Sequence, residues 1–147
     1  MQWYLRNRER LRVEIELMER NGVNYRLYQD EDDNLLWRGP LSVLGHYHED
    51  VRLVYPENFP YDSIKVYVLS PKPPQITHHV LSNGEICYMR PEEWSPEWTA
   101  YAVYLKTIEF LYALYTGEMY DPPSLTSASP SPRRGLLDMI REVFSPW

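Results

Sequence analysis

Cysteine is nearly absent from the sequence, and long hydrophobic runs are missing altogether. The single cysteine, Cys87, cannot form an internal disulfide, and one thiolate cannot build a zinc site of several cysteines. No stretch of about eighteen apolar residues occurs, and the first residues carry mixed charge instead of the apolar run of a secretion signal. We therefore expect a cytoplasmic protein that does not cross a membrane, in which Cys87 serves either packing or chemistry.

Concentrated positive charge is also lacking. The 147 residues have a formal net charge of −6, whereas nucleic-acid binding requires a basic patch on one surface. The basic residues between Arg6 and Arg12 alternate with acidic ones, as on a solvated helix face. We therefore expect no nucleic-acid partner.

Hydrophobic periodicity predicts one domain that begins with a helix and continues as a sheet. An apolar stripe at helical spacing, ended by Asn-Gly at 21–22, predicts a helix over residues 3–20. Four short β-type runs follow, separated by turns with acidic residues, glycine or proline, which predicts an antiparallel meander. These runs cover residues 25–29, 35–38, 51–55 and 64–69.

The next region changes from no periodicity to helical periodicity. Residues 71–96 contain prolines, two adjacent histidines and Cys87, and a long ordered loop of this kind is usually functional. Ser95 has the character of an N-cap with Pro96 at the first helical position, which predicts a second helix that ends near Gly117. The predicted buried stripe of this helix consists of Leu105, Ile108, Leu111 and Tyr115.

The C-terminal region differs in composition from the rest. The pattern divides the chain into a domain at 1–123, a Pro/Ser-rich linker at 124–134 and a short amphipathic helix at 135–147. The apolar residues of this last segment recur at helical spacing and are Leu136, Leu137, Ile140, Val143 and Phe144. A helix of about ten residues is unstable alone, so we expect it to dock on the domain or on a partner.

Three motifs occur in order along the chain. Tyr-Pro-Glu-Asn-Phe-Pro lies at 55–60, Asn-Gly-Glu-Ile-Cys at 83–87 and Trp-Ser-Pro-Glu-Trp-Thr at 94–99. In this order and near these spacings they resemble the signature of the ubiquitin-conjugating enzyme family, over residues 3 to about 123. The resemblance implies an α+β fold of the UBC type, with an N-terminal helix, a four-stranded antiparallel meander, an active-site loop, a central helix and a shortened C-terminal part.

The resemblance also implies a reaction at Cys87. That residue matches the family's acceptor cysteine, which receives a ubiquitin-like protein as a thioester from an activating enzyme and passes it to an amine of a protein substrate. No cofactor is implied. Glu85, Glu92 and Glu93 oppose ionisation of the thiol, so we expect a poorly ionised cysteine that reacts when a partner delivers the donor.

Two further residues are candidates for the same site. The family usually has His-Pro-Asn before the cysteine, and Thr-His-His at 77–79 puts His79 where the Asn helps to hold the oxyanion. An imidazole N–H can donate to an oxyanion, and the alternative is a side chain that only braces the loop. Asp121 matches the acidic residue that orients the incoming amine in the family, although Asp before Pro also starts turns. Both readings stay open for each residue.

The resemblance also concerns partners and origin. Tyr61 and Pro96 match positions where family members contact RING-type ligases, but Glu97 replaces a usually small residue, so a ligase partner stays open. The altered triplet, the many arginines and the short tail resemble prokaryotic members that occur beside activating enzymes and peptidases, some in antiviral operons.

Other functions remain as alternatives. A catalytically inactive module of the same fold that binds a ubiquitin-like protein is the main one, and the retained Cys87 argues against it. A cysteine hydrolase with His79 as base is another. A metal site built on His46, His48 and the paired histidines is not expected, because no cysteine or carboxylate completes a ligand set at a typical spacing.

Overall fold

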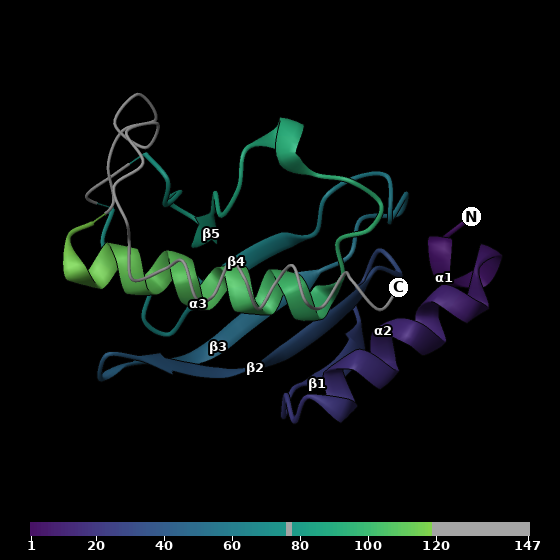
Figure 1. Ribbon diagram of the computed structural model, residues 1–147, viewed down its shortest axis with the longest axis horizontal. Helices are drawn as coiled ribbons and strands as arrows, with labels where there is room; N and C mark the ends of the chain where they lie inside the picture. Colours follow the sequence, from purple (N-terminus) through teal and green to yellow (C-terminus); the bar gives the residue numbers. More distant parts are fainter. Residues whose placement is uncertain (76–77, 119–147) are drawn as a thin grey trace.

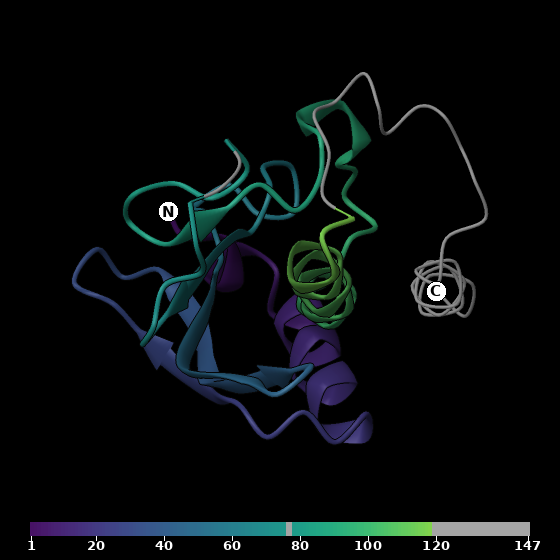
Figure 2. The ribbon, with the colours of Figure 1, turned by 90° about the vertical axis from the view of Figure 1, so that its left-hand side faces the viewer.

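Five antiparallel strands form one sheet in this computed structural model, which describes residues 1–75 and 78–118. The elements are α1 (Trp3–Arg6), α2 (Arg8–Arg20), β1 (Arg26–Gln29), β2 (Leu35–Val43), β3 (His46–Val54), β4 (Lys65–Leu69), β5 (Glu85–Ile86), a 3-10 helix (Pro91–Glu93) and α3 (Ala100–Thr116). The strands are neighbours in chain order, as in a meander, and α3 and α2 cover one face of the sheet (Figures 1 and 2). The predicted α+β class is therefore confirmed.

Two further predictions concern membrane crossing and the C-terminal segments. Within the described residues, no helix is both long and apolar enough to cross a membrane. The predicted linker at 124–134 and the predicted helix at 135–147 lie outside the described residues.

The N-terminal helical region consists of two helices, so the prediction of one helix over 3–20 was wrong in this respect. Asn7 separates them and leaves the helical conformation, with φ −135° and ψ 78°. Its side chain accepts the backbone N–H of Arg10 at 3.0 Å, the capping role that asparagine often fills at a helix start. The predicted end is confirmed, because α2 stops at Arg20 and Gly22 follows with φ 69°.

The hairpin of β2 and β3 is longer than the sequence predicts. Leu44 and Gly45 form its two-residue turn, and both have positive φ (51° and 78°), as a turn that follows the strand twist requires. The register shifts between Gly39 and Leu41, where a proline interrupts the ladder. Gly39 and the proline after it interrupt the alternation of apolar and polar residues, so the sequence predicts a strand that ends at residue 38. The strand β2 itself continues past them to Val43.

A fifth strand corrects the expectation of a four-stranded sheet. In β5, Glu85 and Ile86 pair with Tyr67 and Val66 of β4. Two residues are too few to show a period-two pattern, so periodicity places them in an irregular loop. The strand leads directly into Cys87.

α3 begins later than predicted. The first helical residue is Ala100, and the N-cap is Thr99, whose hydroxyl oxygen accepts the N–H of Ala102 at 3.1 Å. Ser95, the predicted cap, instead starts a turn in which the Trp98 N–H donates to its carbonyl at 3.1 Å. Ser95 and Thr99 lie four positions apart, and both are residue types that cap helices. Thr99 is the actual N-cap, with an extended backbone directly before the first helical residue.

The buried face of α3 was predicted in part. Leu111 is fully buried, Ile108 and Tyr115 are partly buried, and Leu105 belongs to a second cluster apart from the sheet-side core. The residues of α3 in the sheet-side core are Ala100, Val103, Phe110, Leu111 and Leu114. The predicted end is confirmed by Gly117, which caps the helix in the left-handed conformation at φ 76°.

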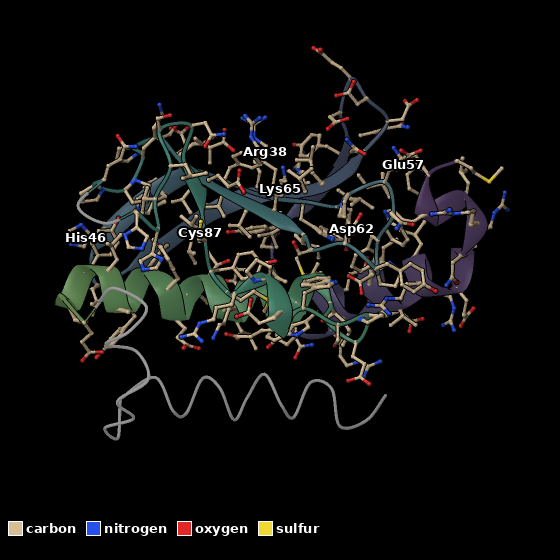
Figure 3. All side chains as sticks on the ribbon, turned by 90° about the horizontal axis from the view of Figure 1, so that it is seen from above. Arg38, His46, Glu57, Asp62, Lys65 and Cys87 are labelled. Carbon is tan, nitrogen blue, oxygen red and sulfur yellow. The ribbon has the colours of Figure 1, made fainter. Side chains whose placement is uncertain are left out.

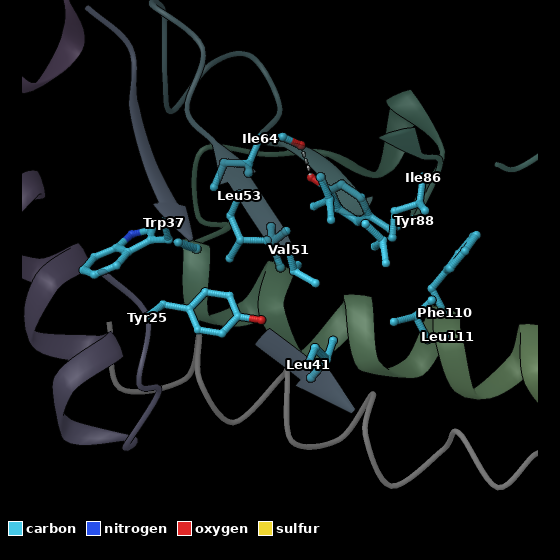
Figure 4. Packing of buried hydrophobic residues seen from close by; sticks show 14 of the residues in the cluster. Tyr25, Trp37, Leu41, Val51, Leu53, Ile64, Ile86, Tyr88, Phe110 and Leu111 are labelled. Carbon is cyan, nitrogen blue, oxygen red and sulfur yellow. Dashed lines mark hydrogen bonds between the residues drawn. The ribbon is translucent and has the colours of Figure 1, made fainter. Parts of the chain in front are cut away.

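The main core lies between the sheet and α3 (Figure 4). Val51 and Leu53 of β3 and Val66 of β4 are completely buried in it. Burying an aliphatic side chain of this size stabilises a fold by about 1.5–3 kcal/mol relative to exposure. The same core holds Ile86, and through it the start of the Cys87 segment.

A buried carboxylate joins α2 to the start of α3. Glu14 accepts the hydroxyl of Tyr55 and the backbone N–H of Ala100, each at 2.8 Å. Arg10 pairs with the same carboxylate at 3.2 Å. The Tyr55 hydroxyl in turn accepts the indole N–H of Trp37 at 2.8 Å. The Tyr-Pro motif at 55–60 is therefore fixed to both helices and to β2.

Candidate active site

Cys87 faces outward because both of its chain neighbours are anchored in the core. Ile86 and Tyr88 are 2% and 8% exposed, whereas Cys87 is exposed. The Tyr88 hydroxyl donates to the carbonyl of Ile64. Side chains alternate along an extended segment, so the thiol between two inward residues points to solvent. Figure 3 shows Cys87 on the α3 side of the sheet, at the end of β5.

The Asn-Gly part of the motif forms the tight turn that precedes β5. The Gly84 N–H donates to the Leu81 carbonyl at 3.0 Å, and the Asn83 side chain accepts the Glu85 N–H at 3.0 Å. Gly84 has φ +89°, and a Cβ there would lie 2.9 Å from the carbonyl oxygen of Val68. This turn therefore requires glycine both for its conformation and for its approach to β4.

His79 lies opposite Cys87 in an antiparallel pairing. Val80 and Ile86 form a bridge, and one step further the Cys87 N–H donates to the His79 carbonyl at 2.8 Å. Residues directly opposite in such a pair have Cβ atoms about 5 Å apart and side chains on the same side. The His79 ring also packs against the ring of His78, with centroids 4.4 Å apart. The structure thus brings together two of the three residues assigned to catalysis.

The environment of Cys87 disfavours the thiolate. Partial burial raises the pKa of the Cys87 thiol, and the Glu85 carboxylate raises it further. The predicted weak ionisation is therefore supported, although burial rather than the nearby carboxylates is the main cause. A free thiol is the prevailing form at neutral pH.

The third catalytic candidate, Asp121, lies outside the described residues, as does the first residue of the altered triplet at 77–79. The described chain ends at residue 118, just past the C-terminus of α3.

His48 has a structural role at the C-terminal end of α3. Its Nδ1 lies 2.6 Å from the carbonyl oxygen of Pro71, and its Nε2 contacts the hydroxyl of Tyr115. A carbonyl only accepts, so Nδ1–H donates and Nε2 accepts in the neutral ring, and burial lowers the pKa of His48. His46 stacks on Tyr115 with centroids 3.8 Å apart. Both nitrogens of His48 are used, and no three metal-ligating side chains gather within the described residues.

The predicted partner positions lie on two segments that are held side by side. The Trp94 indole N–H donates to the carbonyl of Pro60 at 2.9 Å, which joins the segment at 94–98 to the residue before Tyr61. Tyr61 is 68% exposed, and Pro96 and Glu97 are also exposed. The three positions therefore belong to one accessible region.

Arg10 supports this region, and sequence reasoning did not find it. Its guanidinium donates to the carbonyls of Pro96 and Trp98 at 2.9 and 2.8 Å, besides pairing with Glu14. The only signal in the sequence is the four-residue spacing of Arg10 and Glu14, which the exposed pair of Arg12 and Glu16 shares. Nothing in that spacing distinguishes a buried pair from a surface pair.

Comparison with known proteins gives an informative similarity. No model of a known protein family matches the chain. Over 95 residues the chain is 30% identical to ubiquitin-conjugating enzyme E2Q-like protein 1 of Mus musculus, a match that covers 62% of this chain and 57% of the mouse protein. This similarity, together with the α+β fold, supports a relation to ubiquitin-conjugating enzymes.

Proposed function

We propose that this chain is a ubiquitin-conjugating-type enzyme that carries a ubiquitin-like protein as a thioester on Cys87 and transfers it to an amine. The observation that carries the proposal is the outward thiol of Cys87 within the Asn-Gly-Glu-Ile-Cys motif, paired across the backbone with His79. The 30% identity to a mouse protein named as a ubiquitin-conjugating enzyme supports the same class of function.

In the loading step, the sulfur of Cys87 attacks the carbonyl carbon of a thioester held by an activating enzyme. The bond to the Cys87 sulfur forms, the bond to the donor sulfur breaks, and the proton lost by Cys87 ends on the departing thiolate. One thioester replaces another, so the step needs no cofactor on this chain. Because the environment keeps the thiol protonated, we expect loading to depend on the geometry that the activating enzyme imposes.

In the transfer step, an amine of the substrate attacks the thioester carbonyl. An oxyanion forms, then the carbon–sulfur bond breaks, an amide remains, and the proton lost by the amine returns to the Cys87 thiolate. An N–H of the His79 ring supplies a donor to the oxyanion. A donor of this kind is typically worth on the order of 100- to 1000-fold in rate. Asp121 orients the amine in the same proposal.

The proposed partners are a ubiquitin-like protein, an activating enzyme and a protein substrate. A ligase would contact the exposed region of Tyr61, Pro96 and Glu97, where the charge of Glu97 selects against a purely apolar surface. The triplet at 77–79 and the arginine-rich composition resemble those of prokaryotic conjugating enzymes, and on that resemblance the proposal places the chain in a prokaryotic conjugation system, with antiviral defence as its setting.

The test is loading of the purified chain. We would incubate it with ubiquitin, its activating enzyme and ATP, and in parallel with the ubiquitin-like protein and activating enzyme encoded beside its gene. The expected product is an adduct on non-reducing gels that thiols release. Cys87→Ser should give an adduct that resists thiols, and an adduct that persists in Cys87→Ala would exclude the proposal.

Two alternatives predict other results in the same assay. An inactive binding module would bind the modifier without an adduct, and Cys87→Ala would leave the affinity unchanged. A cysteine hydrolase would cleave conjugates with a thiol activated by an adjacent base or by a lowered pKa, and the pKa of Cys87 is raised. The environment of the thiol therefore favours the carrier over the hydrolase.

A further inference from the structure

The helix α3 has a second buried face that points away from the sheet. Ala102 and Leu105 form a cluster of their own, and their exposed fractions are 0% and 5%. At 100° per residue, they share one face with Glu109, roughly opposite the sheet-side residues Val103 and Leu114. Figure 2 shows the sheet on one side of α3 only.

The apolar cover that the described residues supply comes from close by in the chain. Within 1–75 and 78–118, the apolar neighbours of the cluster are Trp98, Tyr101 and Tyr104, which belong to the same stretch of chain as the cluster itself. Side chains of a helix point outward from its axis, so these neighbours flank Leu105 and leave its outer side for a second element.

We propose that residues 136–144 of the same chain form a helix that docks on this outer face of α3. Their apolar residues lie one, three, four, seven and eight positions after Leu136, so that all of them fall on one side of a helix. Ala102 is small, which allows a second helix to approach closely at its position. The segment then belongs to the domain and is not a free tail.

The length of the connection fits this arrangement. Seventeen residues, 119–135, lie between the described chain and the docking segment. A flexible linker of that length spans about 25 Å on average, and a helix of 17 residues such as α3 is also about 25 Å long. The segment can therefore return along the helix that precedes it.

The buried carboxylate of Glu109, on the same face of α3, is also compatible with docking of residues 136–144. Glu109 is only 4% exposed and lies 3.5 Å from Lys106. A carboxylate that is this buried is favoured by positive neighbours. The docking segment and the residues just before it contain Arg133, Arg134 and Arg141.

Disulfide trapping in the full chain tests the contact. In a Cys87→Ser background, Leu105→Cys combined with Ile140→Cys should form an intramolecular bond under mild oxidation, because facing helix residues come within disulfide distance. The matched control combines Ile140→Cys with Tyr28→Cys, which lies on β1 and is exposed, and should not form the bond. Equal bonding in both variants, or a bond only between two copies of the chain, would overturn the proposal.

Hydrogen exchange of the full chain gives an independent readout. Amides of 136–144 should be protected, and Ile140→Asp should remove that protection while Glu142→Gln, on the polar side of the segment, should retain it. Leu105→Asp should expose the same amides. If 136–144 exchange like a free peptide in the unmodified chain, or if protection depends on protein concentration, the proposed docking is wrong.

Discussion

The backbone N–H of Cys87 donates to the carbonyl oxygen of His79 at 2.8 Å. This contact involves only the main chain of His79 and makes no use of its imidazole ring. It also holds the two residues opposite each other whatever side chain stands at position 79. Substitution of His79 therefore separates a chemical role of the ring from bracing of the loop.

We predict that His79→Ala slows discharge of a loaded Cys87 to free lysine by at least about tenfold, or about 1.4 kcal/mol, and changes loading far less. The ring donor acts when the amine attacks, whereas the backbone contact persists. His79→Asn should recover part of the rate, since its amide can also donate. Single-turnover discharge, measured separately from loading, checks the prediction. Equal losses in both steps together with a lower melting temperature would make His79 a brace.

A second prediction concerns the ionisation of Cys87. Burial and the Glu85 carboxylate both raise the pKa of the thiol, and the thiolate is the form that reacts. At pH 8, alkylation by iodoacetamide should be slower than that of free cysteine and should continue to accelerate at more alkaline pH. Glu85→Gln removes one cause, so it should lower the pKa and speed alkylation at pH 8. Glu97→Gln is the control and should leave the rate unchanged.

The buried pair of Arg10 and Glu14 should matter more for stability than its exposed counterpart. Glu14→Ala leaves a partly buried guanidinium without its carboxylate and deprives the Tyr55 hydroxyl and an N–H of α3 of their acceptor. We expect a loss of about 3–5 kcal/mol in the free energy of unfolding, measured by urea denaturation. Glu16→Ala breaks the equally spaced surface pair with Arg12 and should leave the midpoint nearly unchanged. Similar losses in both would refute the distinction.

Two glycines with positive φ allow the packing at the active-site turn to be measured. Gly84 has φ +89° and no room for a Cβ, whereas Gly45 has φ +78° and nothing within 4 Å of that position. Gly45→Ala should cost about 1–2 kcal/mol for the backbone conformation alone. Gly84→Ala should cost more and should also reduce loading of Cys87, because the turn positions that residue. Equal costs would show that the contact with β4 is relieved by a small movement.

Much of the fold follows from local patterns. The end of α2, the left-handed cap at Gly117 and the meander are all visible in the spacing of apolar residues and glycines. Asn7 was not recognised as a break, because the apolar stripe continues across it. β5 was missed because a strand of two residues exists only through its pairing with β4.

The candidate site also combines features that follow from the sequence with features that depend on tertiary structure. The sequence by itself determined that Cys87 is the only possible thiol nucleophile, and its motif supplied the tight turn before β5. Tertiary structure alone decided that the thiol faces outward opposite His79, because that depends on the burial of Ile86 and Tyr88 by distant parts of the chain. It also decided that Glu14 is buried while Glu16 is exposed. Both acids have an arginine four residues earlier, and a local pattern cannot specify which face of a helix the rest of the protein will cover.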